Sequence, residues 1–148
     1  LISLVYERAK ETDKEVVFAI DEARYLMKDS DTLEYLETIF RHHRHHDLSI
    51  QLITQTVDEF LSHDISKMIL DQCAIKQFHK LDGMNEEIAE VFGLNHAQMR
   101  FVQTAIPGGQ ERGYSQALIC VDGDWRGIEV RALPHEQAVI DNETLRSG

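Results

Sequence analysis

Residues 16–20, Val-Val-Phe-Ala-Ile, are followed without a break by Asp21 and Glu22. A short apolar run of this kind is typical of a buried strand in a parallel sheet. Such a strand would deliver two carboxylates to the carboxyl edge of the sheet, where open α/β folds bind their ligands. The alternative is a strand that ends in two acidic residues with no further role. The segment thus favours an α/β fold with a candidate site at the strand end.

In P-loop NTPases an acidic pair at this place is the Walker B motif. On that interpretation Asp21 holds Mg²⁺, directly or through water, and Glu22 orients and polarises the attacking water. The partner motif, G-x-x-x-x-G-K-[ST], does not occur in the 148 residues. The chain also opens on Leu1 rather than on methionine. We therefore expect the later part of a larger protein, with any phosphate loop upstream.

Composition limits the classes of partner. The net charge of −11 disfavours a broad electrostatic grip on DNA or on an anionic membrane. No apolar run approaches the ~18 residues of a membrane span. Cys73 and Cys120 lack metal-type spacing, so we expect reduced thiols in a cytoplasmic protein.

The order of predicted elements is that of a parallel sheet with crossover helices, extended at one edge by an antiparallel hairpin. We see no linker, so residues 1–148 are expected to belong to one domain. We expect strands over residues 16–20, 48–55, 74–79, 115–121 and 126–132. We expect helices over residues 1–11, from Asp29–Asp31 to about His45, from Thr56 onwards, over 84–92 and 95–104, and from Pro134.

Local patterns define several of these helices. Apolar residues at helical spacing predict the buried face of the second helix. Thr56-Val-Asp-Glu59 has the form of a capping box, and Gly93 is a predicted helix C-cap. The residues of the predicted face are Leu33, Leu36, Ile39 and Phe40.

The second predicted strand ends in Ile53-Thr54-Gln55. Neighbouring parallel strands end on the same edge of a sheet, so Gln55 should lie near Asp21 and Glu22. Its amide both donates and accepts, so it could bridge a water, a phosphate and a moving element. The alternative is a glutamine that only serves the turn.

A cluster of basic side chains, Arg41-His-His-Arg44-His-His46, stands where the second helix should end. His42 and His46, four residues apart, could share a face and bind a transition metal. Arg41 and Arg44 could instead be presented at a subunit boundary, where an arginine can stabilise charge on a neighbour's phosphate. A solvated basic helix end is the third interpretation, because cations are favourable at a helix C-terminus.

Together these motifs resemble the HerA–FtsK superfamily of ring-forming, RecA-like ATPases that pump DNA. The shared pattern is a strand ending Asp-Glu, a helix ending Arg-x-x-Arg, a small turn, and a strand ending Thr-Gln. Asp47 departs from the pattern, because relatives usually have glycine or asparagine there. The matching segments are Phe18-Ala-Ile-Asp-Glu-Ala23, Arg41-His-His-Arg44-His-His-Asp-Leu-Ser49 and Ile50-Gln-Leu-Ile-Thr-Gln55.

The downstream part looks most like the conjugal-transfer and type IV secretion ATPases of the VirB/TraC kind. The resemblance covers most of the chain and implies the C-terminal portion of a partial RecA-like P-loop NTPase fold, with a mostly parallel sheet, flanking helices and a C-terminal antiparallel hairpin. The stretches that carry it are Met68-Ile-Leu-Asp-Gln-Cys-Ala-Ile-Lys76, Glu90-Val-Phe-Gly-Leu-Asn-His-Ala-Gln-Met99, and the hairpin with Leu133-Pro-His-Glu136.

The resemblance also implies roles. Asp21 would coordinate Mg²⁺, Glu22 would be the catalytic base, and Gln55 would be the sensor that couples hydrolysis to movement. Arg44 is the better match to the family's helix-end arginine, and Arg41 is the second choice. The implied cofactors are ATP and Mg²⁺. The chain alone is expected to be inactive, because it lacks the phosphate loop.

The implied partners are further copies of the protein in a ring, taken as a hexamer, together with DNA or proteins of a secretion apparatus. The implied location is the cytoplasm, with a secretion complex able to hold the protein at the inner face of the membrane. Three competing interpretations remain open: a HerA-like DNA translocase in repair, an inert interaction module derived from an ATPase, and a metal-binding protein built on the histidines.

Overall fold

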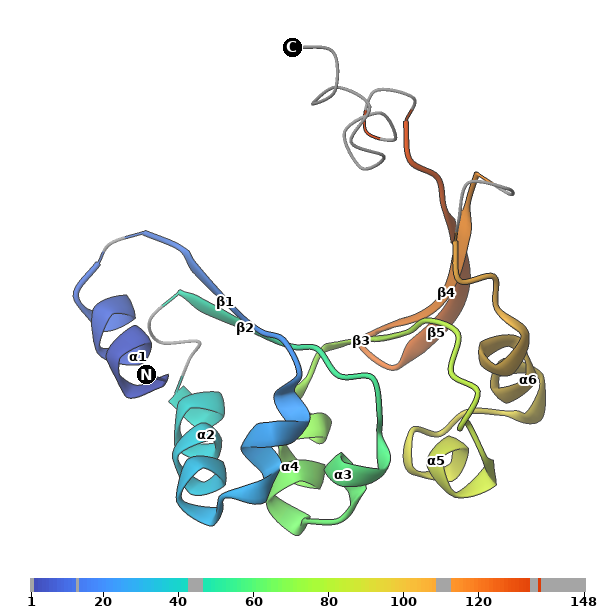
Figure 1. Ribbon diagram of the computed structural model, residues 1–148. Coiled ribbons are helices and arrows are strands. Elements are labelled where there is room, and N and C mark those ends of the chain that lie inside the picture. Colours follow the sequence, from blue (N-terminus) through green and yellow to red (C-terminus); the bar gives the residue numbers. More distant parts are fainter. Residues whose placement is uncertain (1, 13, 43–46, 109–112, 134–135, 137–148) are drawn as a thin grey trace, which may run out of the picture. The chain divides into compact units, whose positions relative to one another are not determined.

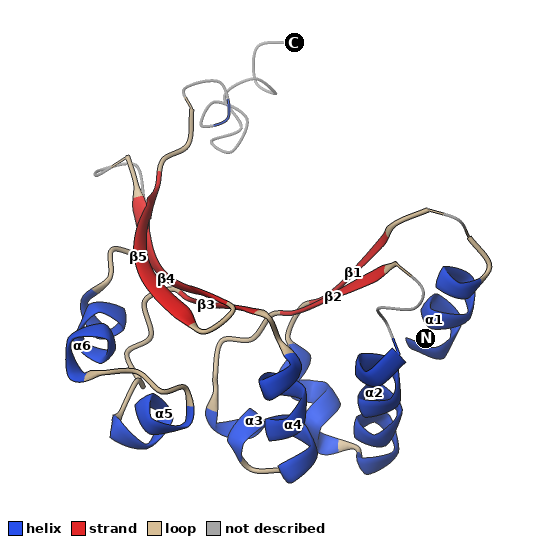
Figure 2. Cartoon of the chain, turned by 180° about the vertical axis from the view of Figure 1, so that it is seen from behind, coloured by secondary structure: helices blue, strands red, loops and turns tan. Residues whose placement is uncertain are grey.

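The computed structural model describes residues 2–12, 14–42, 47–108, 113–133 and 136. It divides into two compact units, Leu1–Cys73 and Ala74–Gly148. Each unit is described by itself below. Figure 1 labels their helices and strands, and Figure 2 shows the same elements from behind.

The first unit is built on two parallel strands, β1 (Val16–Ile20) and β2 (Leu48–Leu52). Ile20 lies opposite Leu52 at their carboxyl ends. This α/β unit confirms the two strands that the sequence predicts, although β2 ends before Gln55. The helices of the unit are α1 (Ile2–Lys10), the 3₁₀ helix η1 (Ala23–Lys28), α2 (Ser30–His42), α3 (Asp58–Leu61) and α4 (Asp64–Gln72).

Within this unit the strands are covered on one face. Helices α1, α2 and α4 lie on the same side of β1 and β2 (Figure 1). Phe18 and Ile20 pack into the core on that side, whereas the side chain of Val17 is 63% exposed. The prediction of a fully buried strand is therefore wrong for the described chain. The run is continuous in apolar residues, but a strand is buried on both faces only when both have a layer to pack against.

Helix α2 carries the predicted apolar face. Leu33, Leu36, Ile39 and Phe40 are all buried, and they are shared among three neighbouring core clusters. At the start of α2 the Asp29 carboxylate accepts a hydrogen bond from the Thr32 backbone N–H, at 3.0 Å. An acceptor there satisfies a donor that the first helical turn leaves unpaired. The predicted apolar face and the predicted start of the helix near Asp29–Asp31 are confirmed.

The segment after β2 differs from the prediction. Residues from Thr56 onward were expected to open one helix, but α3 and α4 are separate, with Ser62 and His63 between them. The predicted capping box is also wrong, because the N-cap of α3 is Val57, which has no side-chain cap. Thr54 explains why the first helix begins at Asp58 and not at Thr56. Its hydroxyl contacts the Thr56 backbone, and such a local turn competes with helix formation.

The second unit contains an antiparallel sheet in the order β3 (Ile75–Phe78), β4 (Ser115–Val121) and β5 (Asp124–Val130). The predicted β4–β5 hairpin is confirmed, although β5 begins two residues earlier than expected. Its turn residues Asp122 and Gly123 both have positive φ, 50° and 90°, as a two-residue turn between twisted strands requires. The hairpin extends the sheet in the antiparallel sense, as predicted, because β4 pairs antiparallel with β3.

The helices of the second unit are α5 (Glu86–Val91) and α6 (His96–Thr104), both near their predicted positions. Gly93 has φ +65°, and its N–H donates to the Glu90 carbonyl, so the predicted glycine stop after α5 is confirmed. The core of this unit includes Ile88, Val102 and Leu118. The helix expected from Pro134 lies outside the described residues, apart from Glu136.

Helix α6 begins at a complete capping box, which leads to a stability prediction. The Asn95 side chain accepts from the Gln98 N–H at 3.0 Å, and the Gln98 side chain accepts from the Asn95 N–H at 2.8 Å. We expect Asn95→Ala to lower the free energy of unfolding by about 1 kcal/mol, because the Gln98 backbone N–H loses its side-chain acceptor. Urea unfolding followed by circular dichroism measures the change. Arg100→Ala, at an exposed position of α6, is the control and should change the free energy by less than about 0.5 kcal/mol.

Candidate functional site at the carboxyl ends of β1 and β2

The backbone beyond β1 turns sharply at the predicted acidic pair. Ile53 donates to the Ile20 carbonyl and Ala23 donates to the Ile53 carbonyl, each at 2.9 Å, so pairing continues past both strands. Between these bonds Glu22 adopts a left-handed conformation, with φ 51° and ψ 42°. A residue with a side chain pays about 1 kcal/mol for this conformation, and strain of this kind often occurs at functional sites. The turn sends the chain directly into η1.

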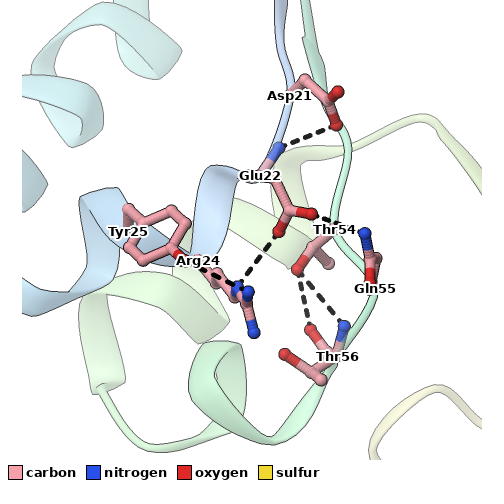
Figure 3. A network of polar contacts seen from close by, with 7 residues as sticks. All are labelled: Asp21, Glu22, Arg24, Tyr25, Thr54, Gln55 and Thr56. Carbon is pink, nitrogen blue, oxygen red and sulfur yellow. Dashed lines mark hydrogen bonds and ion pairs between the residues drawn. The ribbon is translucent and has the colours of Figure 1, made fainter.

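Glu22 and Gln55 are in contact across the ends of the two strands. The Gln55 amide Nε2 donates to Glu22 Oε1 at 2.6 Å, although the two residues are 33 positions apart in the chain (Figure 3). A bond to a charged acceptor is stronger than one between neutral groups. The structure therefore brings together two of the predicted site residues. The roles predicted for them remain predictions.

The position of Gln55 depends on its two threonine neighbours. The Thr54 hydroxyl donates to the Thr56 carbonyl at 3.0 Å and accepts from the Thr56 N–H at 3.4 Å. Gln55 is thus held at the tip of a small turn with its side chain exposed (Figure 3). A strand-end amide presented in this way is accessible to other hydrogen-bond partners.

Asp21 stands beside this pair with an exposed side chain. Its Oδ1 accepts from the Glu22 backbone N–H at 2.8 Å, which fixes the carboxylate at the strand end. A carboxylate has several lone pairs, so one backbone bond still leaves capacity for a cation. Magnesium fits such a donor set, because it is commonly held by one or two carboxylates, substrate phosphates and water. Asp21 could hold this ion if phosphate oxygens complete the shell.

A metal site closed by protein side chains alone would need at least three ligands close together. No group of three or more histidine, cysteine, aspartate or glutamate side chains is placed to hold a metal within the residues that the structure describes. His42 lies exposed at the end of α2, whereas its proposed partner His46 lies outside the described residues. The histidine pair as a metal site therefore stays a prediction.

The structure describes Arg41, one of the two arginines of the basic cluster. Arg41 pairs with Glu37 on the same helix, with Nη2 2.5 Å from Oε1, and its side chain is 58% exposed. It lies on the surface of α2. Arg44, the preferred candidate, lies outside the described residues.

Arg24 is a member of the site that the sequence analysis missed. Its Nε lies 3.0 Å from Glu22 Oε2 in an ion pair, and its Nη2 donates to the Tyr25 hydroxyl at 3.3 Å (Figure 3). The guanidinium also lies over the Tyr25 ring, 4.9 Å from the ring centre. No periodic pattern points to Arg24, because the contact depends on the left-handed turn at Glu22. An arginine two residues after a candidate catalytic carboxylate was the available signal.

The arrangement can thus perform two tasks. Asp21 offers an exposed carboxylate to a cation, and Glu22 offers a carboxylate held between an amide and a guanidinium. A carboxylate can accept a proton from a water molecule that comes within hydrogen-bond reach. The candidate site is therefore suited to hydrolytic chemistry on an anionic, metal-bound substrate.

Among the described helices, none is both long and apolar enough to cross a membrane.

Comparison with known proteins agrees with this architecture. No protein-family model matches the chain, and no curated protein matches it in sequence. Among solved structures the chain is similar to VirB4 of Thermoanaerobacter pseudethanolicus, with a TM-score of 0.75 and 21% sequence identity. The similarity covers 92% of this chain and 36% of the VirB4 chain, so the chain spans about a third of that protein's length. The predicted resemblance to VirB-type proteins, and with it a partial P-loop ATPase fold, is thus confirmed at the level of the fold.

Proposed function

We propose that this chain is the Walker B-bearing, C-terminal portion of the ATPase domain of a type IV secretion or conjugal-transfer motor. The parent protein would couple ATP hydrolysis to the movement of DNA or of a secreted substrate. The contact between Glu22 and Gln55 carries this proposal, because it joins a candidate base to a candidate sensor at the ligand-binding edge of a parallel sheet. The similarity of the fold to VirB4 supports the same proposal.

The residues of the edge take the following roles in the proposed reaction. Asp21 holds the magnesium ion of MgATP, directly or through water. The bound ion supplies positive charge that screens the phosphate oxygens. Glu22 orients the attacking water and accepts its proton. Gln55 contacts Glu22, so a change in its hydrogen bonding on nucleotide binding or hydrolysis can be passed to β2.

Other parts of the machine would come from outside this chain. The phosphate-binding lysine and the serine or threonine of a Walker A loop are absent from the 148 residues, and we propose that they stand upstream in the parent protein. Among the described residues, Val17 exposes 63% of its surface on the face of β1 that points away from the helices, and an exposed apolar strand face of this kind supports the presence of a further covering layer in the parent protein. We also propose a ring, taken as a hexamer, in which Arg44 reaches a neighbour's nucleotide. The ring would work in the cytoplasm, where a secretion complex could hold it at the inner face of the membrane.

The proposal predicts a difference between the parent protein and this chain. The intact parent should hydrolyse ATP in the presence of Mg²⁺ and lose turnover when EDTA removes the ion. The 148-residue chain alone should show no turnover above the rate of the buffer, because it lacks the groups that cradle the phosphates. A coupled phosphate-release assay on both proteins measures this. A parent without turnover would support an inert interaction module instead.

The identity of the motor needs a second observation. Transfer or secretion that fails when the gene is deleted, and returns with the wild-type gene, supports a secretion or conjugation motor. Normal transfer in the deletion strain, together with sensitivity to DNA damage, would contradict that assignment and support a HerA-like translocase in repair.

A further inference from the structure

We propose that Arg24 is a positioning residue that holds Glu22 in a resting conformation and so restrains ATP hydrolysis. This inference rests on the proposed function, because it gives Glu22 the role of the catalytic base. It adds a restraint that the motif pattern does not contain. The restraint comes from the same chain and acts through the side chain of Glu22.

Both carboxylate oxygens of Glu22 are engaged. Oε1 accepts from Gln55 Nε2 at 2.6 Å, and Oε2 lies 3.0 Å from Arg24 Nε. The two partners come from opposite sides of the site, Gln55 from the turn after β2 and Arg24 from η1 (Figure 3). The Glu22 side chain is thus turned toward η1 and the turn, whereas Asp21 stays at the strand end, bonded to the Glu22 N–H. Oε2 is buried against Arg24 and Oε1 accepts from Gln55, so in this conformation the carboxylate offers few of its lone pairs to a water molecule.

Burial strengthens the contact with Arg24. The side chains of Arg24 and Glu22 are 29% and 30% exposed, but the atoms that meet, Nε and Oε2, are themselves buried. Their approach lacks the direction of a hydrogen bond, so the contact is an ion pair between desolvated atoms. Water cannot reach Oε2 in this conformation, and removal of one partner would leave the other as a buried, uncompensated charge.

Tyr25 fixes the far side of the guanidinium. Its hydroxyl accepts a hydrogen bond from Arg24 Nη2 at 3.3 Å. The Arg24 guanidinium carbon and Lys28 Nζ lie 4.9 Å and 5.1 Å from the centre of its ring. A cation over an aromatic face is attracted to it. Arg24 is therefore anchored by η1 itself, so the restraint does not need a neighbouring subunit.

The release of the restraint follows from the same contacts. An incoming anionic phosphate competes for the amide of Gln55, which is exposed, and loss of that bond leaves Glu22 held by Arg24 alone. Glu22 can then turn toward the water at the phosphate. If Arg24 is absent, the buried Oε2 loses its compensating charge, and the carboxylate is more stable where it meets water. Glu22 can then act as the base without the release step that the wild-type side chain of Arg24 requires.

The test is the basal rate of ATP hydrolysis by the intact parent protein, without DNA or secretion partners. Arg24→Gln should raise the basal kcat roughly fivefold, which corresponds to about 1 kcal/mol for a partly exposed ion pair. The KM for ATP should stay within about twofold, because Arg24 does not hold the nucleotide in this proposal. Arg24→Lys keeps the charge but not the planar fork, so it should raise kcat by less than Arg24→Gln.

Two further variants make the result specific. Arg8→Gln removes an arginine whose side chain is 79% exposed on α1 and should leave kcat at the parental value. The double variant Glu22→Gln with Arg24→Gln should be as slow as Glu22→Gln alone, because the gain acts through Glu22. An unchanged or lower kcat in Arg24→Gln, with an active parent, would overturn the inference and leave the proposed function standing. A parent without Mg²⁺-dependent turnover would overturn both.

Discussion

Glu22→Gln in the intact parent protein is expected to lower the kcat for ATP hydrolysis by about 10²–10⁴-fold while nucleotide still binds. Glutamine keeps the size of the side chain but cannot accept the proton of the attacking water. Asp21, which would hold the magnesium ion, is untouched, and so are any phosphate-binding residues upstream. Binding of a fluorescent ATP analogue and phosphate release, measured on the same preparation, separate the two effects.

A matched variant shows that the effect belongs to the site. Glu34→Gln makes the same chemical change at an exposed position of α2, away from the candidate site, and should leave turnover within about twofold of the parent. Turnover that survives Glu22→Gln would remove Glu22 from the catalytic role. Loss of nucleotide binding together with turnover would instead mean that the side chain holds the fold or the ligand.

Leu36→Ala is expected to lower the free energy of unfolding of the 148-residue chain by about 2–5 kcal/mol. Leu36 is fully buried and packs in one cluster with Phe40 and Ile69, so it joins α2 to α4. Ile20 and Leu52, the last residues of β1 and β2, pack against the same cluster. Truncation leaves a cavity beneath the strand ends that carry Asp21, Glu22 and the turn to Gln55. Urea unfolding by circular dichroism gives the value.

Leu4→Ala provides the comparison for this core variant. Leu4 lies on α1 with 63% of its surface exposed, so the same chemical change should alter the free energy of unfolding by less than about 0.5 kcal/mol. Equal losses for the two variants would show that the cluster around Leu36 does not hold the first unit together. A loss confined to Leu36 supports the packing of α2 and α4 beneath the site.

Sequence patterns predicted those parts of the fold that depend on local periodicity. The apolar spacing of α2 is regular over three turns, so its buried face could be identified residue by residue. The contact between Glu22 and Gln55 was also predictable, because parallel strands that pair in register end at the same edge. In both cases one geometric rule connects the sequence to the position of the side chain.

Features that depend on competing contacts were not predicted correctly. The helix expected from Thr56 is replaced by a turn at Thr54 and two separate helices, because a local hydroxyl contact competes with the cap. The strand that pairs with β3 was not specified by the sequence. Its four residues, Ile-Lys-Gln-Phe, contain no information on which strand they pair with, and the antiparallel ladder with β4 decides it.

The amino-acid sequence by itself determined the α/β class, the two parallel strands, the acidic pair at the end of β1 and the amide at the end of β2. These follow from strand and helix periods, which act over a few residues. Only the tertiary structure decided which face of the strands is covered, and that Glu22 lies between Gln55 and Arg24. Those outcomes depend on a left-handed turn at one residue and on the packing of segments far apart in the chain. No local pattern encodes either, because the free energy that selects them arises from contacts formed when the chain folds.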